Sequence, residues 1–387
     1  MSLKKTPLRL SARALLSVER LVRPAPAISP ASILVLEYLL PLGCCIHLTP
    51  LYQAIKRSVP ESTITVATRG LGLSVLRHNT FIDYLIETPD PLVTPLKAAQ
   101  SLRAELSRRS LRPELILTGA SDQRTRIAVM AMLTAPAIRG GFTIHNELYH
   151  RPLIYDSQRS LIDNNLRMAE FVSASPEHRE PRVFFSEANA AAAQKLIQAA
   201  NPEARPLVVF VTQNSGGQLT GWHTSRFVEV IQHTYNKLGC AVVYVGTDRD
   251  HDSIEEIRKA AGGVGVSLAG KTSVTELAAL LALADAAVSL DTGTMHVGRC
   301  VGLPMVVIGP SWQKPIEWLP LELPQVRILR GPDRDRKDIP ANYKLDEVEA
   351  PAVIVALEDL LTKYPANAAS RQQRLNAGIS TIDHLQP

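Results

Sequence analysis

The stretch Ala286–Ser311 reads AAVSLDTGTMHVGRCVGLPMVVIGPS and places a polar cluster between two apolar runs. The runs AAVSL and PMVVIG have the length and composition of buried β-strands, and DTGTMHVGRCVG between them has the spacing of a helix. Two parallel strands joined through a helix form a βαβ unit. The stretch therefore predicts a parallel sheet covered by helices, with the polar cluster at the point where a strand ends and a helix begins.

The same alternation of strand and helix runs through most of the 387 residues. In the first half, short β-rich runs such as 31–39 and 113–119 alternate with helical stretches such as 95–110. The alternation loosens after Gly141 and restarts at Leu207. A chain of this length exceeds what one hydrophobic core usually supports. We therefore predict an α/β protein of two doubly wound parallel-sheet domains that face a central cleft.

Composition shifts along the chain suggest where the domains begin and end. The first residues are basic and amphipathic, a stretch flanked by proline and charge interrupts the alternation, and the last residues are polar enough that we expect a mobile tail. The predicted parts are an N-terminal extension at 1–30, a first domain at 31–180, an interdomain connection at 181–205, a second domain at 206–365 and a polar C-terminal tail at 366–387.

Composition also narrows the functional classes. Hydrophobic residues make up 45% of the chain and charged residues 20%, which is typical of a globular protein with material for two cores. The net charge is +5, but Lys and Arg are dispersed rather than gathered with aromatic residues, so we expect no nucleic-acid partner. The four cysteines show no C-x-x-C spacing, so we expect no metal site, no disulfide scaffold and a reducing cytoplasm.

Residues 1–23 carry basic residues on one helical face and apolar residues on another. This pattern suits either an interfacial helix against an anionic membrane face or a helix packed on its own domain. The longest apolar run, Ile33–Cys45, is too short to cross a membrane and contains Glu37. We therefore expect a cytoplasmic protein, with peripheral contact with the inner membrane as one interpretation of its N-terminus.

The polar cluster of the opening stretch has the features of an anion site. Asp291, Thr292 and Gly293 begin a helix directly after a buried strand, so unpaired backbone N–H groups point toward the carboxyl edge of the sheet. His296 follows one turn later, and the turn at 212–217 provides a second set of backbone donors after another strand. Two such turns fit a ligand with two phosphates. Each feature also has a structural interpretation: Asp291 as an ordinary N-cap, His296 as a structural histidine and the second turn as a plain turn.

Three segments resemble one known family. The segment LAGKTSVTELAALLALADAAVSLDTGTMHVGRCVGLPMVVIGPS is similar to the donor-binding signature of the lipopolysaccharide heptosyltransferase family, glycosyltransferase family nine. The block NSGGQLTGWHTSRFVEVI resembles a second family motif, with Trp222 and Phe227 in register. The segment ILVLEYLLPLGCCIHLTPLYQAIKRSVPES resembles the family's N-terminal motif. Together these segments extend the resemblance over most of residues 31–325.

The resemblance implies a GT-B fold of two Rossmann-like domains, the first binding the acceptor and the second a nucleotide-sugar. It also implies an inverting, metal-independent transfer in which a carboxylate acts as base, and ADP-heptose is the default donor of the family. No cofactor other than the nucleotide-sugar substrate is implied. Carried over by position, the donor-binding residues are Asp291, Thr292, Gly293, Thr294 and His296 on one side, Thr212, Asn214, Ser215 and Gly216 on the other, and Asp248 at the ribose or base.

Two departures fall on the catalytic side of this pattern. Cys44 occupies the position of the family's proposed catalytic Asp, and a thiol is mostly protonated at neutral pH. Gly221 replaces a Lys whose charge either Lys271 or Arg299 would have to supply. Two candidates for the base remain, His47 and Glu37. His47 could instead cap a helix or pack in the core, and Glu37 could instead reach solvent from a strand end.

Two functions compete on this basis. One is an inverting glycosyltransferase that moves a heptose-like sugar from a nucleotide diphosphate to a lipopolysaccharide or another glycan or lipid-linked acceptor. The other is a catalytically degenerate protein that binds a nucleotide-sugar on the same scaffold without transferring it. A third chemistry on this scaffold, such as nucleotide-sugar epimerisation, has no specific support in the sequence.

Overall fold

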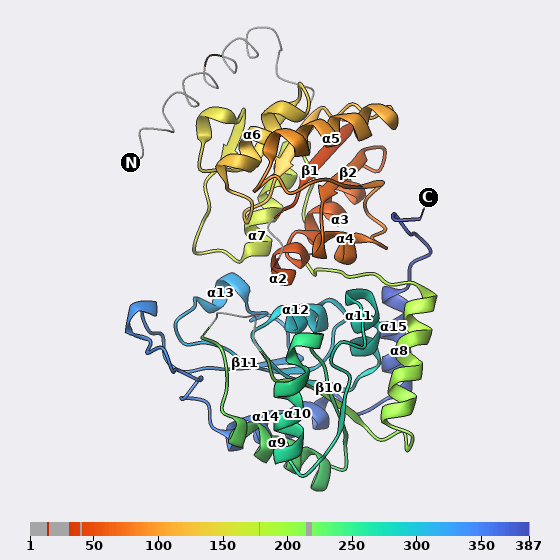
Figure 1. The fold of residues 1–387 in the computed structure, drawn as a ribbon, viewed down its shortest axis with the longest axis vertical. Coiled ribbons are helices and arrows are strands. Elements are labelled where there is room, and N and C mark those ends of the chain that lie inside the picture. Colours follow the sequence, from red (N-terminus) through yellow and green to blue (C-terminus); the bar gives the residue numbers. More distant parts are fainter. Residues whose placement is uncertain (1–13, 15–30, 39–40, 178, 214–218, 387) are drawn as a thin grey trace. The chain divides into compact units, whose positions relative to one another are not determined.

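The computed structural model describes residues 14, 31–38, 41–177, 179–213 and 219–386 (Figure 1). The chain divides into two compact units, with the boundary between Pro181 and Arg182, and the residues after Asp383 belong to the first unit. Among the described residues, each unit contains one six-stranded sheet in which every pairing is parallel. The predicted class, two parallel-sheet α/β domains, is confirmed.

The first unit has the strand order β3-β2-β1-β4-β5-β6. Its central strands are almost continuous apolar runs, because helices cover both faces of the sheet. The elements are β1 (Ser32–Leu36), α2 (Leu42–Ile46), α3 (Thr49–Ser58), β2 (Thr63–Thr68), α4 (Leu71–Leu76), β3 (Tyr84–Glu87), α5 (Pro95–Arg108), β4 (Leu115–Thr118), α6 (Thr125–Thr134), β5 (Ile138–Phe142), η2 (Asn146–Leu148), β6 (Arg151–Leu153), α7 (Leu161–Leu166) and η3 (Arg167–Val172).

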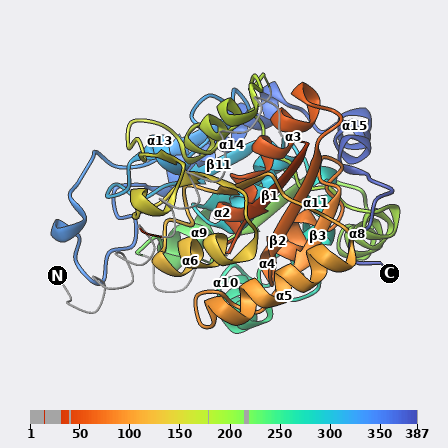
Figure 2. The same ribbon diagram turned by 90° about the horizontal axis from the view of Figure 1, so that it is seen from above.

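The two faces of the first sheet are covered by different helices. Helices α5 and α6 pack on the face that contains Leu34, Leu36 and Tyr38, where they form one hydrophobic cluster. Figure 2 shows these helices on one side of β1 and β2, with α3 on the other side. Helix α3 packs against α7 and η3. Side chains that alternate along β1 therefore enter two separate layers of core, and Glu37 continues the α3 layer.

The second unit repeats the architecture with the order β12-β11-β10-β7-β8-β9. Helices α9, α10 and α14 cover one face, and α8, α11, α12 and α15 belong to the other (Figure 1). The elements are α8 (Glu187–Ala200), β7 (Leu207–Val211), α9 (Thr224–Asn236), β8 (Ala241–Tyr244), η4 (Asp248–Asp250), α10 (His251–Ala260), β9 (Val266–Ser267), α11 (Val274–Leu283), β10 (Ala286–Leu290), α12 (Gly293–Cys300), β11 (Met305–Ile308), α13 (Pro315–Trp318), β12 (Val326–Leu329), η5 (Arg336–Asp338), α14 (Ala350–Lys363) and α15 (Ala368–Gly378).

The segment 181–205 is not a free connection. Its alanine-rich part is α8, which begins with a capping box at Ser186 and packs against α11 of the second unit. The small side chains of Ala190 and Ala193 form the buried stripe of this helix and permit close packing. The expectation of an interdomain connection here was wrong, because tertiary packing makes the segment part of the second unit.

The segment 366–387 is not a mobile tail. It contains helix α15, which is capped by Asn367 and packs against α11. Arg371 forms a bidentate ion pair with Asp285, a buried residue that directly precedes β10. The polar composition that suggested a tail reflects the exposed face of this helix, and Arg371 and Arg374 anchor its other face. In the part of the chain that the structure describes, no helix has the length and hydrophobicity that a membrane crossing requires. The predicted amphipathic extension at 1–30 lies outside that part except for residue 14.

Candidate functional site

The strand order of the second unit defines a topological switch point between β7 and β10. From β7 the chain adds β8 and β9 on one side of the sheet and β10 and β11 on the other. The loops after β7 and β10 therefore leave in opposite directions, and ligands of open α/β sheets bind in the crevice between such loops. The pairing of Ser289 with Val211 brings the residues that directly follow the two strands, Asp291 after β10 and Thr212 after β7, to the same edge.

The start of α12 has the backbone geometry of an anion site. Thr292 is the N-cap residue, but its side chain makes no capping hydrogen bond. Only 8% of Thr292 is exposed, and among the described residues its Oγ1 has no hydrogen-bond partner. Gly293 and Thr294, the first two helical residues, are half-buried. The first N–H groups of the helix and the Thr292 hydroxyl are thus left for an external ligand.

Two ionisable side chains flank this helix start. Burial raises the pKa of Asp291 to about 6. Burial also lowers the pKa of His296 to about 3, and the positive charge of Arg299 adds to this shift. The Nε2 atom of His296 lies 3.9 Å from Oδ1 of Asp291, but the imidazole is neutral at pH 7, so the two groups are not an ion pair there. A carboxylate acceptor and a neutral imidazole donor therefore stand side by side at the N-terminus of α12.

Arg299 is a buried cation of the same helix. It is buried in the last turn of α12, and its Nη2 donates to Oε1 of Glu322 at 2.5 Å. The ring centroid of Trp318, in α13, lies 6.3 Å from that of His296. Lys271, the other residue considered as a replacement for the family's lysine, is exposed. Arg299 influences His296 electrostatically, so its charge reaches the α12 site.

The other predicted donor residues lie at the same edge or outside the described residues. Thr212 is buried directly after β7 and accepts a hydrogen bond from Gln213 at 3.2 Å. Asp248 is exposed in η4, after β8, and lies against Gly270: a Cβ at Gly270 would come within 1.6 Å of Asp248 Oδ1. Asn214, Ser215 and Gly216 fall in the segment that is not described.

The first unit has its own switch point, between β1 and β4. Glu37 directly follows β1 and is 1% exposed, so it does not reach solvent from the strand end. Tyr52 donates its hydroxyl to Oε2 of Glu37 at 2.5 Å. Burial raises the pKa of Glu37 to about 8, which outweighs the opposite effect of hydrogen bonds from Tyr52 and Cys45. Glu37 is therefore mostly protonated at pH 7.

Cys44 belongs to the same cluster as Glu37, and His47 ends the helix that carries Cys44. Cys44 lies in α2, and burial raises the pKa of its thiol to about 11, with a hydrogen bond to Ser121 opposing the shift. This thiol is therefore protonated at neutral pH and cannot act as a base. His47 caps the end of α2, is buried, and accepts a hydrogen bond at its backbone carbonyl from Asn165.

Asp122 is a member of this cluster that the sequence reading missed. It is 3% exposed, follows β4, and accepts the backbone N–H of Tyr38 at Oδ1, at 3.1 Å. Its negative charge contributes to the raised pKa values of Glu37 and Cys44. The sequence contains a signal for Asp122, because an Asp shortly after the buried run LILT is expected at the carboxyl edge of a parallel sheet.

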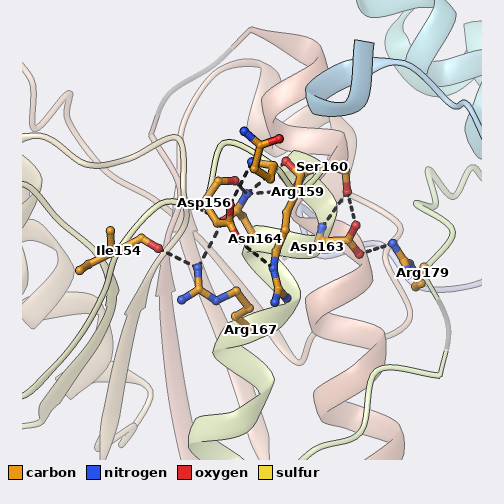
Figure 3. Close-up of polar contacts among 9 residues, drawn as sticks. Ile154, Asp156, Arg159, Ser160, Asp163, Asn164, Arg167 and Arg179 are labelled. Carbon is orange, nitrogen blue, oxygen red and sulfur yellow. Dashed lines mark hydrogen bonds and ion pairs between the residues drawn. The ribbon is translucent and has the colours of Figure 1, made fainter. Parts of the chain in front are cut away.

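A well-ordered loop follows β6 at the carboxyl edge of the first sheet. The side chain of Asn164 accepts the Asp156 N–H at 3.0 Å and donates to the carbonyls of Asp156 and Ser160 at 2.8 and 3.1 Å. Figure 3 shows this amide at the centre of the loop, with Arg167 donating to the carbonyl of Ile154. The side chain of Ile154 is 76% exposed. One buried amide thus fixes a loop that presents polar and apolar groups to solvent.

Both switch points carry buried polar side chains. A sequence profile described as "Glycosyltransferase family 9 (heptosyltransferase)" matches residues 127–334, more than half of the chain. The chain belongs to glycosyltransferase family 9. Among curated relatives, it is 28% identical to the lipopolysaccharide heptosyltransferase 2 of Salmonella typhimurium over 167 residues, which are 41% of this chain and 48% of the relative. The chain thus spans about half the length of the curated relatives that it matches.

Solved structures agree at the level of the fold. A family 9 glycosyltransferase from Veillonella parvula superposes with a TM-score of 0.76 at 19% identity, covering 88% of this chain and 99% of the other. The E. coli ADP-heptose lipopolysaccharide heptosyltransferase II gives a TM-score of 0.70 at 18% identity, covering 87% of this chain and 100% of the other. The two Rossmann-like domains of this family 9 chain are therefore of the GT-B type.

Proposed function

We propose that this family 9 protein is an inverting glycosyltransferase that moves a heptose-like sugar from a nucleotide-diphosphate donor to a lipopolysaccharide or another glycan or lipid-linked acceptor. The observation that carries the proposal is the start of α12, at the switch point of the second sheet, where the buried Thr292 hydroxyl has no hydrogen-bond partner among the described residues and does not cap the first N–H groups of the helix. The donor is proposed to be ADP-linked, because a structural neighbour is described as an ADP-heptose enzyme.

In this proposal the second unit binds the donor. The diphosphate lies at the N-terminus of α12, where Thr292, Gly293 and Thr294 supply donors and the neutral His296 adds one more. Asp291 accepts hydroxyl groups of the adjoining sugar. The helix terminus and Arg299 stabilise the charge that develops on the leaving diphosphate, so the proposed reaction needs no metal and no cofactor. Proposed further contacts are Thr212, Asn214, Ser215 and Gly216 to the diphosphate and Asp248 to the ribose or base.

The first unit is proposed to bind the acceptor. The transfer needs a base for the attacking hydroxyl, and we place this base in the polar cluster at the carboxyl end of β1, where Glu37 and His47 are the candidates from the sequence. A carboxyl group with a pKa of about 8 is a strong base when it is ionised, so a Glu37 base would make the rate rise with pH up to about 8. We also propose that the protein works in the cytoplasm at the inner face of the membrane, because lipid-linked acceptors are held there.

One observation favours a second function. Cys44 occupies the position of the family's catalytic carboxylate, and its raised pKa of about 11 removes it as a base. Gly221 likewise provides no charge where the family has lysine. A protein that retains the donor site but transfers no sugar would account for both replacements. The two functions differ in turnover and share donor binding.

Calorimetry and a transfer assay test both functions. ADP, ADP-heptose and a UDP-sugar are titrated into the wild type and into Asp291→Ala, with Asp252→Ala as the control because Asp252 is an exposed aspartate of α10 in the same unit. We expect ADP-heptose to bind the wild type and the control, and to bind Asp291→Ala at least tenfold more weakly, whereas ADP, which lacks the sugar that Asp291 contacts, binds all three. If no nucleotide binds the wild type, both functions are rejected.

Turnover separates the two functions. ADP release from ADP-heptose is followed with heptose-deficient lipopolysaccharide as acceptor, in the wild type and in Glu37→Gln and His47→Gln. Transfer by the wild type supports the glycosyltransferase. Binding of ADP-heptose without transfer or donor hydrolysis supports the degenerate binding protein. Unchanged turnover in both variants would show that neither Glu37 nor His47 is the base.

A further inference from the structure

Position 44 stands beside a carboxylate that comes from another strand. The thiol of Cys44 is hydrogen-bonded to Ser121, the residue that precedes Asp122. Strands β1 and β4 are neighbours, so α2, which follows β1, and the loop after β4 meet at the switch point. The carboxylate of Asp122 is anchored there, because its Oδ1 accepts the N–H of Tyr38 at 3.1 Å. A negative charge is therefore present next to the position where the family places its own.

A carboxylate at position 44 and the carboxylate of Asp122 disfavour each other electrostatically. The charge of Asp122 already disfavours ionisation of Cys44 and Glu37, which shows that all three groups share one poorly solvated region. An aspartate at position 44 would place a second carboxylate in that region, and two carboxylates in one site cannot both ionise easily. A neutral residue at position 44 is thus the expected companion of a carboxylate at position 122.

The loop that carries Asp122 is held in place by a buried amide. Asn165 of α7 accepts the N–H of Ala120 at 2.8 Å and donates to the carbonyl of His47 at 3.1 Å. One side chain thus connects the loop after β4 with the end of α2. Gln123 adds a hydrogen bond to the carbonyl of Ala120 at 2.7 Å. A carboxylate on this loop is preorganised in the way that a general base requires.

We propose that Asp122 supplies the carboxylate that position 44 lacks and acts as the general base on the acceptor hydroxyl. The inference rests on the proposed transfer reaction. In the step, the acceptor O–H bond breaks and its proton passes to Asp122, while the oxygen forms a bond to the anomeric carbon. The bond between that carbon and the diphosphate oxygen breaks, and the diphosphate leaves with the electron pair. Glu37 lies close enough to Asp122 for the two charges to interact.

The first test compares Asp122→Asn with Asp90→Asn. Asp90 is a matched control, because it also accepts a backbone N–H in a loop at the carboxyl edge of the first sheet, but it follows β3, at the sheet's edge. Asp122→Asn keeps an oxygen for the Tyr38 N–H and removes the charge. We expect its kcat for transfer from ADP-heptose to fall by about 100-fold or more, with ADP affinity unchanged, whereas Asp90→Asn stays within about threefold of the wild type.

The second test moves the charge back to position 44. Cys44→Asp combined with Asp122→Asn should recover at least tenfold of the lost kcat, because it restores the family's placement of the carboxylate. Cys44→Asp alone should lower activity, because it places two carboxylates in one site. A structural role of Asp122 would instead lower the melting temperature of Asp122→Asn and would not be rescued by Cys44→Asp.

The outcomes distinguish the inference from the function on which it rests. A wild type that binds ADP-heptose but transfers nothing rejects the proposed transferase and this inference together. A wild type that transfers the sugar, with Asp122→Asn retaining its kcat, rejects the inference alone. Loss of kcat without rescue by Cys44→Asp and with a lowered melting temperature also overturns it. Loss of kcat with unchanged melting, followed by rescue, supports it.

Discussion

The buried carboxyl groups Asp291 and Glu37 follow central strands of the two sheets, yet they differ in charge at pH 7. Burial raises both pKa values, to about 6 for Asp291 and to about 8 for Glu37. The difference of about two units places neutral pH between them, so Asp291 is ionised while Glu37 keeps its proton. Raised pKa values of buried carboxyl groups are typical of functional sites, and each unit carries one.

Asp291 predicts how donor binding depends on pH. If its carboxylate accepts hydroxyl groups of the donor, protonation removes an acceptor, so affinity is lost as the pH falls through about 6. We expect the apparent Kd for ADP-heptose to rise by about tenfold between pH 7 and pH 5, since only the ionised fraction binds. Calorimetry at pH 5 to 8 measures this. In Asp291→Asn the dependence should be absent, and an equal dependence in that variant would assign the titration to another group.

Glu37 predicts a pH dependence of stability with the opposite sign to that of an ion-paired carboxylate. The folded protein keeps the Glu37 proton up to about pH 8, whereas the unfolded chain releases it near 4.5. Unfolding therefore releases a proton in this window, and stability falls as the pH rises, by up to about 1.4 kcal/mol per pH unit. Urea titrations should show that the free energy of unfolding of Glu37→Gln increases relative to that of the wild type between pH 5 and pH 8. A constant difference would contradict the raised pKa.

The site residues that sequence alone could predict are those close together in the chain. The cluster from Asp291 to His296 lies within one strand–helix junction, so the junction itself indicates an anion site. Asp122 becomes part of a site only through the fold, because its partner Tyr38 lies 84 positions away. Glu37 and His47 were predicted as candidate bases because they lie close in sequence to Cys44, the position of the family's catalytic carboxylate. The pKa of Glu37 could not be predicted from the sequence, because it depends on burial and on Tyr52.

Among the elements, the central strands were predictable and the helices α8 and α15 were misjudged. Strands buried on both faces leave long apolar runs that need no knowledge of their neighbours. Helix α15 is polar by composition, and the partner that orders it is Asp285, 86 positions from Arg371. Helix α8 was visible as a helix, but its packing on α11 was not, since small alanine side chains carry little pattern.

The contact between Arg371 and Asp285 predicts how α15 contributes to stability. Asp285 is almost fully buried and also accepts the N–H of Leu207 at 2.7 Å, so loss of its arginine leaves a buried charge unpaired. We expect Arg371→Met to cost about 3 kcal/mol of unfolding free energy, measured in urea. Gln373→Met, an exposed change on the same helix, should cost almost nothing. Equal stability of both variants would mean that the ion pair does not hold α15.

At the scale of the whole molecule, the chain is two α/β units that each have a parallel sheet and a core of their own. The two-domain class followed from alternation and length, because both are properties of the chain as a whole. The extent of each unit did not follow, since contacts rather than composition decide that residues 182–205 and α15 belong to the second unit. Chains with separate cores commonly unfold in more than one step.

Nucleotide binding should therefore stabilise one unit selectively. ADP at 100 times its Kd adds about 2.7 kcal/mol to the unit that binds it, which corresponds to about 5–10 °C for a domain of this size. Because the proposed donor site lies wholly in the second unit, on segments that follow β7, β8 and β10, we expect scanning calorimetry to show two transitions, of which ADP shifts one. Hydrogen exchange of peptides from β10 and α12 assigns that transition to the second unit. A single transition that moves as a whole would instead mean that the two units unfold cooperatively.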